Sequence, residues 1–320
     1  MERDDGEKAM AENIRLDGKV AIVTGGGRGL GRAMALALAE AGARVVAVDL
    51  VAENLARVER AADSVSGALA CVAADIRNAR DCQHAIAAAH ERFGGLDILV
   101  NNAGLLPSYA WPGRFLVGAP QAKFWNLGDD VVQNVIDTNY VAHDRMTRYA
   151  VPHMIAKGWG RVVNVTTRLT TMNRSGGSPY GASKAALEMA SEIWVKDLAG
   201  TGVTVNILNP GAAVDTPGFA TPEEKRVATA SGRLHMMHPD RMRAPIVWLV
   251  SHATDGINAM RYDAVAWDPD RPAEEQAALH GRPLGFELKP KASGDAHEVR
   301  DDRPAAGTAA RFGEDRSGQA

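Results

Sequence analysis

The chain has 320 residues, of which 46% are hydrophobic and 23% charged, a composition typical of an ordinary globular protein. It carries 36 lysine and arginine residues against 39 aspartate and glutamate residues, and this balance argues against a nucleic-acid partner. The two cysteines, Cys71 and Cys82, lack C-x-x-C spacing, which excludes a disulfide framework. The charged N-terminus and the absence of a long apolar run predict a cytoplasmic protein that does not contact membranes.

Short β-branched runs alternate with alanine-rich segments of helical period from Lys19 onward. The predicted strands cover residues 20–24, 44–49, 69–74, 97–101, 161–166, 203–208 and 261–267. The predicted helices cover residues 30–41, 53–64, 79–92, 130–156, 178–199 and 239–251. Because the strands are nearly continuously apolar, we expect an α/β fold: a single Rossmann-type, doubly wound parallel sheet with helices on both faces.

The predicted domain spans residues 17–280 and follows a polar extension at residues 1–16. Residues 281–320 contain six glycines, three prolines, seven basic and seven acidic residues, with hardly any apolar periodicity. This composition predicts a disordered tail. The alternative is an arm that binds a partner or clasps an oligomer.

A glycine-rich turn at residues 24–31 connects the first predicted strand to an alanine-rich helix. Glycine has no Cβ, so backbone N–H groups and the start of the helix can approach a pyrophosphate closely. The spacing differs from G-x-G-x-x-G. The residues expected to bind the phosphates of a dinucleotide are Gly25, Arg28, Gly29, Leu30 and Gly31.

Asp49 ends the second predicted strand, 18 residues after Gly31. A carboxylate there can accept hydrogen bonds from the adenosine ribose and repel a 2′-phosphate, which favours NAD over NADP. Arg28 is the counterargument, because a guanidinium in the phosphate loop could help hold a 2′-phosphate. We take the acid as the main determinant and expect NAD, with NADP as the alternative.

Three motifs resemble those of the short-chain dehydrogenase/reductase family and occur in the family's order. They are T-G-x-x-x-G-x-G at residues 24–31, N-N-A-G at residues 101–104 and Tyr180-x-x-x-Lys184, and the resemblance covers about residues 17–268. It implies an NAD(P)-dependent oxidoreductase that interconverts a secondary alcohol and a ketone. It also implies further cofactor contacts at Asp75, Ile76, Asn102, Ala103, Gly104, Pro210, Gly211 and Thr216. For Asp75, a helix N-cap is an equal alternative.

Tyr180 and Lys184 share one face of a predicted helix. A nearby ammonium and an oxidised nicotinamide would lower the pKa of the phenol, which predicts Tyr180 as the proton-transfer residue. The resemblance implies that Lys184 also binds the nicotinamide ribose. It further implies that Asn139 bends the long helix and orders a water beside Lys184. Thr167 stands where relatives usually have serine: its hydroxyl would hold the substrate oxygen, while its methyl group crowds the pocket.

Residues 105–126 and 212–238 are predicted to flank the substrate as mostly irregular segments. Their apolar side chains favour an apolar or aromatic ketone or alcohol, although several could instead attach long loops to the core. These side chains are Leu105, Leu106, Tyr109, Trp111, Phe115, Phe124, Trp125, Phe219, Met236 and Met237. His235 and His238 lack a completing ligand, so we expect no metal.

The resemblance implies a homodimer or homotetramer, because the helix at residues 178–199 packs against its mate in similar enzymes. Leu187, Ile193 and Trp194 supply apolar side chains for such packing. The alternative to an enzyme is a dinucleotide-binding sensor or scaffold on the same fold with little turnover. The pairing of Tyr180 with Lys184 favours the enzyme, since a mere binder does not need a tuned phenol.

Overall fold

The structure, a computed structural model, describes residues 14–62, 67–114, 116, 123–216, 218–230, 232, 236–268 and 270–286. Most of the predicted polar extension and of the predicted disordered tail lies outside these residues. Every described helix and strand belongs to the unit that ends at Gly285. Within the described part of the chain, no helix is both long enough and apolar enough to cross a bilayer.

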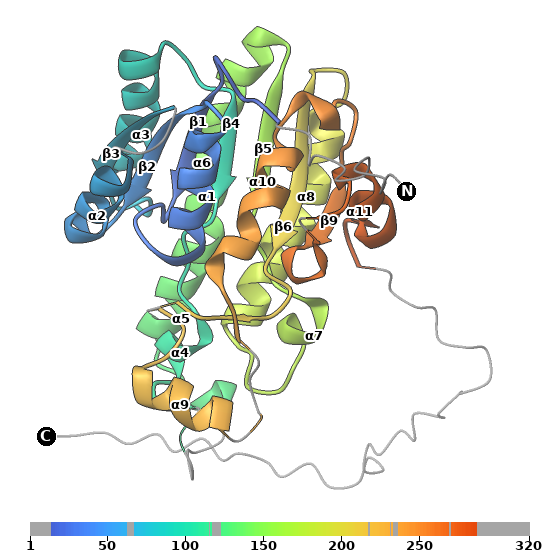
Figure 1. The fold of residues 1–320 in the computed structure, drawn as a ribbon. Coiled ribbons are helices and arrows are strands. Elements are labelled where there is room, and N and C mark those ends of the chain that lie inside the picture. The colour runs from blue at the N-terminus through green and yellow to red at the C-terminus, as the bar shows by residue number, and fades with distance from the viewer. Residues whose placement is uncertain are drawn as a thin grey trace, which may run out of the picture. The chain divides into compact units, whose positions relative to one another are not determined.

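An eight-stranded sheet forms the centre of the molecule, in the order β10-β9-β6-β5-β4-β1-β2-β3 (Figure 1). All neighbouring strands are parallel except the short edge pair β9 and β10. The strands are β1 Val20–Thr24, β2 Arg44–Asp49, β3 Ala68–Ala73, β4 Ile98–Asn101, β5 Gly160–Asn164, β6 Val203–Asn209, β9 Met260–Asp263 and β10 Arg282–Pro283. The expected doubly wound parallel sheet is therefore confirmed.

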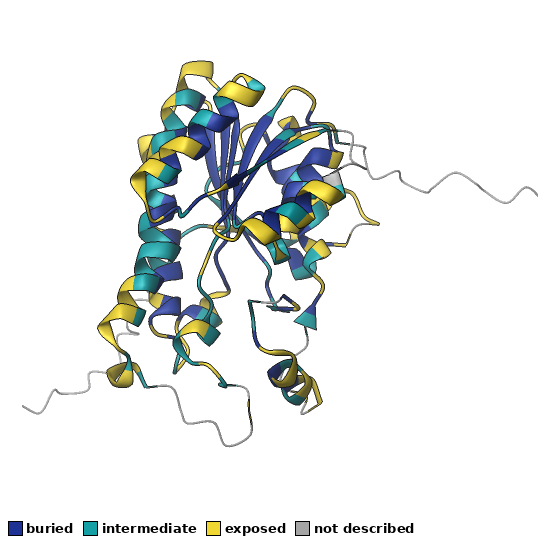
Figure 2. Ribbon diagram, turned by 90° about the vertical axis from the view of Figure 1, so that its left-hand side faces the viewer, coloured by how far each residue is buried: buried dark blue, intermediate teal, exposed yellow. Residues whose placement is uncertain are grey.

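Both faces of the sheet are covered, because successive strand side chains point into two separate hydrophobic cores. In β1, Ala21 and Val23 belong to one core, whereas Val20 and Ile22 belong to the other. Helices α1 (Gly29–Glu40), α2 (Ala52–Ala62) and α10 (Arg243–Leu249) pack in the first core. Helices α3 (Ala79–Phe93) and α6 (Ala142–Lys157) pack in the second. Figure 2 shows the buried strands between helices whose outer sides are exposed.

The single long helix expected over residues 130–156 is interrupted. Helix α5 (Asp129–Ile136) leads into a π-helical turn, η2 (Asp137–Val141), before α6 begins. Asn139 lies in this turn. Hydrophobic periodicity does not distinguish one π turn from continuous α-helix, so the sequence pattern could not locate it. The helix expected over residues 178–199 is α8, Tyr180–Asp197.

Several other predicted boundaries also differ. The segment at residues 212–238, expected to be mostly irregular, contains helix α9 (Pro222–Ala230) and a two-stranded sheet of β7 (Ala213–Val214) and β8 (Met236–Met237). The predicted strand at residues 261–267 ends at Asp263, because the 3-10 helix η5 (Ala264–Ala266) follows. Strand β10 lies inside the predicted disordered tail, where it pairs with β9 after helix α11 (Ala273–His280).

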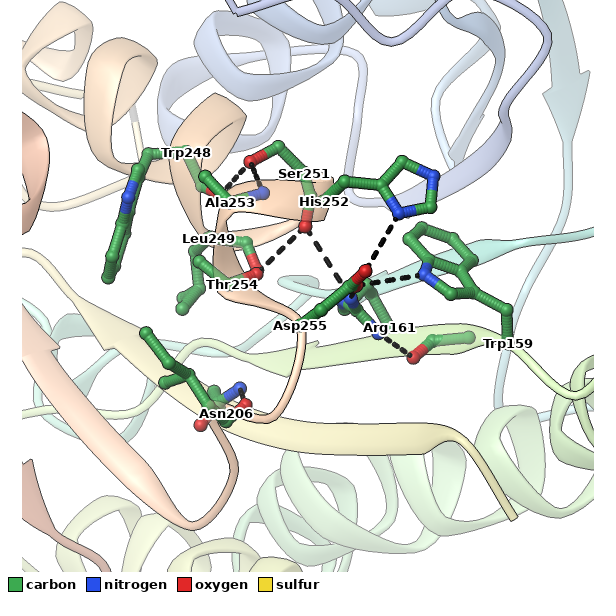
Figure 3. Close-up of polar contacts among 12 residues, drawn as sticks. Trp159, Arg161, Asn206, Trp248, Leu249, Ser251, His252, Ala253, Thr254 and Asp255 are labelled. Atoms are coloured by element: carbon green, nitrogen blue, oxygen red, sulfur yellow. Dashed lines mark hydrogen bonds and ion pairs between the residues drawn. The ribbon is translucent and has the colours of Figure 1, made fainter.

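A buried arginine anchors the amino end of β5. The guanidinium of Arg161, 2% exposed, is paired with Asp255 (Figure 3). The same carboxylate accepts a hydrogen bond from Trp159 Nε1 at 3.1 Å and contacts His252 Nδ1 at 3.0 Å. Lys19 Nζ lies 3.5 Å from the centre of the Trp159 ring. These contacts hold the start of β5 to the turn that follows α10.

Candidate active site

A cleft of about 670 Å³ lies beside the neighbouring strands β1 and β4. At this point of the sheet the strand order changes direction, because β2 and β3 lie on one side of β1, whereas β4, β5 and β6 lie on the other. The walls of the cleft come from residues that directly follow β1, β2, β3, β4, β5 and β6, and therefore from the carboxyl edge of the sheet. Ligands of open α/β sheets bind at such a switch point. A volume of several hundred Å³ is enough for a cofactor and part of a substrate.

The glycine turn after β1 is attached to the turn after β4. Thr24 Oγ1 accepts hydrogen bonds from the backbone N–H groups of Asn102, at 2.9 Å, and Ala103, at 3.2 Å. Asn102 Nδ2 donates to the Thr24 carbonyl at 2.9 Å. Gly25 has φ +63°, and a Cβ there would lie 2.9 Å from Ala103 Cα. Only glycine fits this position, so the two turns form one close-packed wall.

The same region brings together most of the residues predicted to bind the cofactor. All five predicted phosphate-loop residues line the cleft, and so do Asp49, Asp75, Ile76, Asn102, Ala103, Gly104, Pro210 and Thr216. Gly211 does not. It has φ +71°, and a Cβ there would lie 2.9 Å from both Asp263 Cβ and Val265 Cγ1. Glycine at this position therefore allows the chain to pack closely against β9 and η5.

The Asp49 carboxylate is held next to the phosphate loop. It accepts hydrogen bonds from the backbone N–H groups of Gly27 and Val51, each at 3.0 Å. A Cβ at Gly27 would lie 2.8 Å from Asp49 Oδ2, so this close approach also requires glycine. By contrast, the guanidinium of Arg28 lies beside Gly218, whose ideal Cβ position is 3.4 Å from Arg28 Nη2.

Asp75 does not cap helix α3, so that alternative is wrong. The cap is Asn78, whose side chain accepts a hydrogen bond from the N–H of Arg80. Asp75 instead forms an ion pair with Arg77 at 2.7 Å. The hydrogen bond from Arg77 holds the pKa of the Asp75 carboxyl below its ordinary value.

Three of the four predicted catalytic residues meet at the opposite end of the cleft. Tyr180 is the first residue of α8 and Lys184 follows one turn later, and both are buried. The Thr167 side chain lies near enough to the Tyr180 hydroxyl to lower its pKa. Lys184 Nζ donates a hydrogen bond to the Val165 carbonyl at 2.9 Å. All three side chains line the cleft.

Burial is the main cause of the pKa shifts of Tyr180 and Lys184. It raises the pKa of Tyr180 to about 12, although the Thr167 side chain and the charge of Arg174 act in the opposite direction. Burial also lowers the pKa of Lys184 to about 8. The surrounding chain therefore keeps the phenol protonated at neutral pH.

Asn139 does not line the cleft but supports its wall from behind. Its Nδ2 donates to the Leu105 carbonyl at 2.9 Å and to Ser183 Oγ at 3.0 Å, and its Oδ1 accepts from the N–H of Leu105 at 2.8 Å. Each of its two polar atoms thus has a partner within the chain. A π turn often occurs at a functional site, and here it brings Asn139 between the β4 turn and α8.

His143 was missed by the sequence analysis because no motif marks it. It is fully buried, and its Nε2 lies 2.7 Å from the Ala103 carbonyl. Burial, together with the charge of Lys184, lowers the pKa of His143 to about 3. The imidazole is therefore neutral at physiological pH and holds the turn after β4 in place.

The wall at the substrate end is more polar than expected. Of the predicted apolar residues, Leu105, Leu106, Tyr109 and Phe219 line the cleft. The side chains of Phe124 and Trp125 are about two-thirds exposed and lie elsewhere, as do Trp111, Met236 and Met237, whereas Phe115 and His235 fall outside the described residues. Four polar residues that were not predicted line it instead: Arg168, Thr170, Thr171 and Arg174.

Thr216 lies against the phosphate loop. A Cβ at Gly29, which has φ +54°, would lie 2.9 Å from Thr216 Cγ2. The Thr216 N–H donates to the Val214 carbonyl at 2.9 Å, and its carbonyl accepts from the N–H of Phe219 at 3.1 Å. These bonds fix the segment after β7 across the cleft from the turn after β4.

Comparison with known proteins gives a consistent result. The sequence model of the short chain dehydrogenase family matches residues 19–226. The 3-oxoacyl-acyl-carrier-protein reductase FabG of Thermotoga maritima is 29% identical over 74% of this chain and 92% of the relative. The L-fucose dehydrogenase of Bos taurus is 31% identical over 77% and 87%. A similar solved structure is the crystal structure of 3-ketoacyl-(acyl-carrier-protein) reductase from Brucella melitensis complexed with NADH. Its sequence is 27% identical, its TM-score is 0.63, and the match covers 76% of this chain and 94% of that chain.

Proposed function

The chain belongs to the short-chain dehydrogenase family and is an oxidoreductase, and on that premise we propose that it interconverts a secondary alcohol and a ketone with NAD(P). The observation that carries this proposal is the convergence of Tyr180, Thr167 and Lys184 in one wall of a cleft whose other end is the glycine loop. A hydroxyl pair beside a lysine suits proton transfer to a substrate oxygen.

The residues around the glycine loop fit a dinucleotide. Gly25, Gly29 and Gly31 line the cleft without a side chain between their backbone and a ligand, and backbone N–H groups at the start of α1 suit a pyrophosphate. NAD(P) supplies or accepts the hydride when bound. We propose NAD as the preferred form, because the Asp49 carboxylate is fixed where an adenosine ribose would lie and Arg28 is turned toward Gly218.

Thr167, Tyr180 and Lys184 have different roles in the proposed proton transfer. Thr167 donates a hydrogen bond to the substrate oxygen and keeps that oxygen next to the Tyr180 hydroxyl. In reduction, Tyr180 donates its proton to the oxygen as the carbonyl carbon gains the hydride, and in oxidation it takes that proton back. Burial raises its pKa to about 12, which keeps Tyr180 in the protonated form that donates in reduction. Lys184, whose pKa is about 8, lies one helical turn away to return a proton to Tyr180.

Three further features of the proposal rest on the sequence and the family. We propose that residues 17–280 form the catalytic domain. We also propose that the substrate has an apolar or aromatic body, and that the protein is a homodimer or homotetramer. On α8, the expected Ile193 is 49% exposed and Met189 is 39% exposed, which suits packing against a second copy, whereas Leu187 is fully buried within its own chain. A cytoplasmic location remains a prediction.

The test is oxidation of NADH and NADPH by the purified protein with a panel of aromatic and aliphatic ketones, followed by nicotinamide absorbance. We expect turnover with NADH, loss of at least about a hundredfold in kcat for Tyr180→Phe, and unchanged NADH affinity in that variant. Tight NADH binding without turnover of any ketone would contradict the proposal and favour a sensor. A preference for NADPH would contradict the role proposed for Asp49.

A further inference from the structure

The two ends of the cleft differ in charge. Its only acidic lining residues among those described are Asp49, which ends β2, and Asp75, which follows β3 and pairs with the lining residue Arg77, and all three lie at the adenosine end. Around the hydroxyls of Thr167 and Tyr180, which both follow β5, the charged lining residues are Arg168, Arg174 and Lys184, while Arg28 belongs to the glycine turn. The substrate end therefore has a positive potential that an apolar substrate would leave uncompensated.

The two arginines are not equivalent. Arg168, at the N-terminal cap of α7 (Leu169–Met172), lies 3.7 Å from the Asp263 carboxylate. Arg174 follows α7, and no acidic side chain in the described part of the chain lies within ion-pair distance of it. The positive charge of Arg174, together with burial, lowers the pKa of a second guanidinium, Arg114.

Arg174 also lies close to the reacting group. It shares the cleft wall with Tyr180, and its positive charge lowers the pKa of the phenol against the effect of burial. Thr170 and Thr171, between the two arginines in the sequence, line the same wall. A guanidinium with two hydroxyl-bearing neighbours suits a planar anion, which can accept two parallel N–H bonds from arginine.

We propose that the substrate is an oxo acid, or the corresponding hydroxy acid, whose carboxylate binds Arg174 while its carbonyl oxygen binds Thr167 and Tyr180. This inference rests on the proposed function and names its substrate class. The carboxylate contact orients the carbonyl carbon, and the lining side chains of Leu105, Leu106 and Phe219 accommodate an apolar body. The substrate is thus amphipathic rather than wholly apolar.

The test compares acids with matched neutral ketones. Benzoylformate, benzoylpropionate and benzoylbutyrate differ in the distance from carbonyl to carboxylate, and each is assayed beside its primary amide. Arg174→Gln should lower kcat/KM for the preferred acid at least about tenfold, mainly through KM, and change the amide less than about threefold. Arg80→Gln removes one exposed arginine charge outside the cleft and should change neither.

Comparison of each acid with its amide separates binding of the carboxylate from the influence of Arg174 on Tyr180. Loss of the Arg174 charge raises the pKa of Tyr180, an effect that acts on acid and amide alike. The ratio of acid to amide activity therefore isolates the carboxylate contact. Arg174→Glu should invert the preference, so that the amide becomes the better substrate of each pair.

A binding measurement keeps the inference falsifiable without turnover. Calorimetric titration of the same acids and amides, with and without NADH, should show tighter binding of the acid, and Arg174→Gln should abolish that difference. Equal affinity of acid and amide in the unsubstituted protein, or an acid preference that survives Arg174→Gln, overturns the inference and leaves the proposed function intact. Turnover of no ketone, with Arg174-dependent binding of acids, overturns the proposed function and supports an anion site in the cleft.

Discussion

The buried ion pair between Glu188 and Arg261 connects the two segments that carry Tyr180 and Thr167. Glu188 lies on α8 two turns after Tyr180 and is fully buried, and its carboxylate is 2.8 Å from Arg261 on β9. The Thr166 hydroxyl donates to the same carboxylate at 3.2 Å. Arg261 Nη2 donates to the Thr167 carbonyl at 2.9 Å. The pair therefore connects the helix of Tyr180 to the backbone of Thr167.

Replacement of Arg261 by methionine should cost about 3 kcal/mol of unfolding free energy at neutral pH, because it leaves the Glu188 carboxylate buried and unpaired. The matched control is Arg148→Met on α6. Arg148 pairs with Asp144 at 2.8 Å, but its side chain is 58% exposed, so its loss should cost less than about 0.5 kcal/mol. Urea denaturation followed by tryptophan fluorescence measures both values.

The loss of unfolding free energy in Arg261→Met, called the deficit below, should depend on pH. Burial raises the pKa of Glu188 above its ordinary value of 4.5, while the charge of Arg261 and the hydrogen bonds lower it in part. A carboxyl with a raised folded-state pKa stabilises the protein below its unfolded-state pKa and loses that contribution as pH rises through the folded-state pKa. Without Arg261 the folded-state pKa rises further, so the variant loses more stability than the unsubstituted protein between about pH 4.5 and neutrality.

The loss of stability should accordingly become smaller as pH falls toward 4.5, because protonation of Glu188 removes the unpaired charge, and it should be largest at neutral pH. The activity of Arg261→Met should fall through kcat, since Thr167 loses the contact that holds its backbone. A deficit equal at both pH values, or no larger than that of Arg148→Met, would refute the account of this pair. Glu188→Gln should restore part of the stability of Arg261→Met, because a neutral amide is cheaper to bury than an unpaired carboxylate.

The remaining predictions concern the two ends of the cleft. Asp49→Asn keeps the shape of the side chain but removes its charge. Because charges about 8 Å apart interact by about 2 kcal/mol at an effective dielectric constant of 20, the ratio of kcat/KM with NADPH to that with NADH should rise about tenfold or more. An unchanged ratio would contradict the role of Asp49. Thr167→Ser retains the hydroxyl and should keep kcat within about threefold, whereas Thr167→Val should lower it about a hundredfold and shift the Tyr180 limb of the pH profile upward, since the Thr167 hydroxyl lowers that pKa. Equal activity of the serine and valine variants would contradict hydrogen bonding by Thr167.

Local sequence signals determined the fold and much of the cleft. The alternation of β-branched runs with alanine-rich segments is a property of neighbouring residues, and it predicted the strands of the parallel sheet. Glycines between a strand and a helix, and the acid at the end of the next strand, predicted residues that the structure brings together in the cleft wall. The spacing of Tyr180 and Lys184 placed both on one helical face. Each of these features depends on a few consecutive residues, so no tertiary contact was needed to find it.

Only the tertiary structure decided which side chains reach the substrate end and how they ionise. Arg174 follows a short helix that periodicity does not reveal, and only the folding of this segment over the cleft brings its charge to Tyr180. The raised pKa of the phenol is a consequence of burial, and burial depends on packing from several elements. Glu188 and Arg261 are 73 residues apart, so their contact has no local signature. Electrostatics and desolvation depend on distance in space, which the order of residues along the chain does not contain.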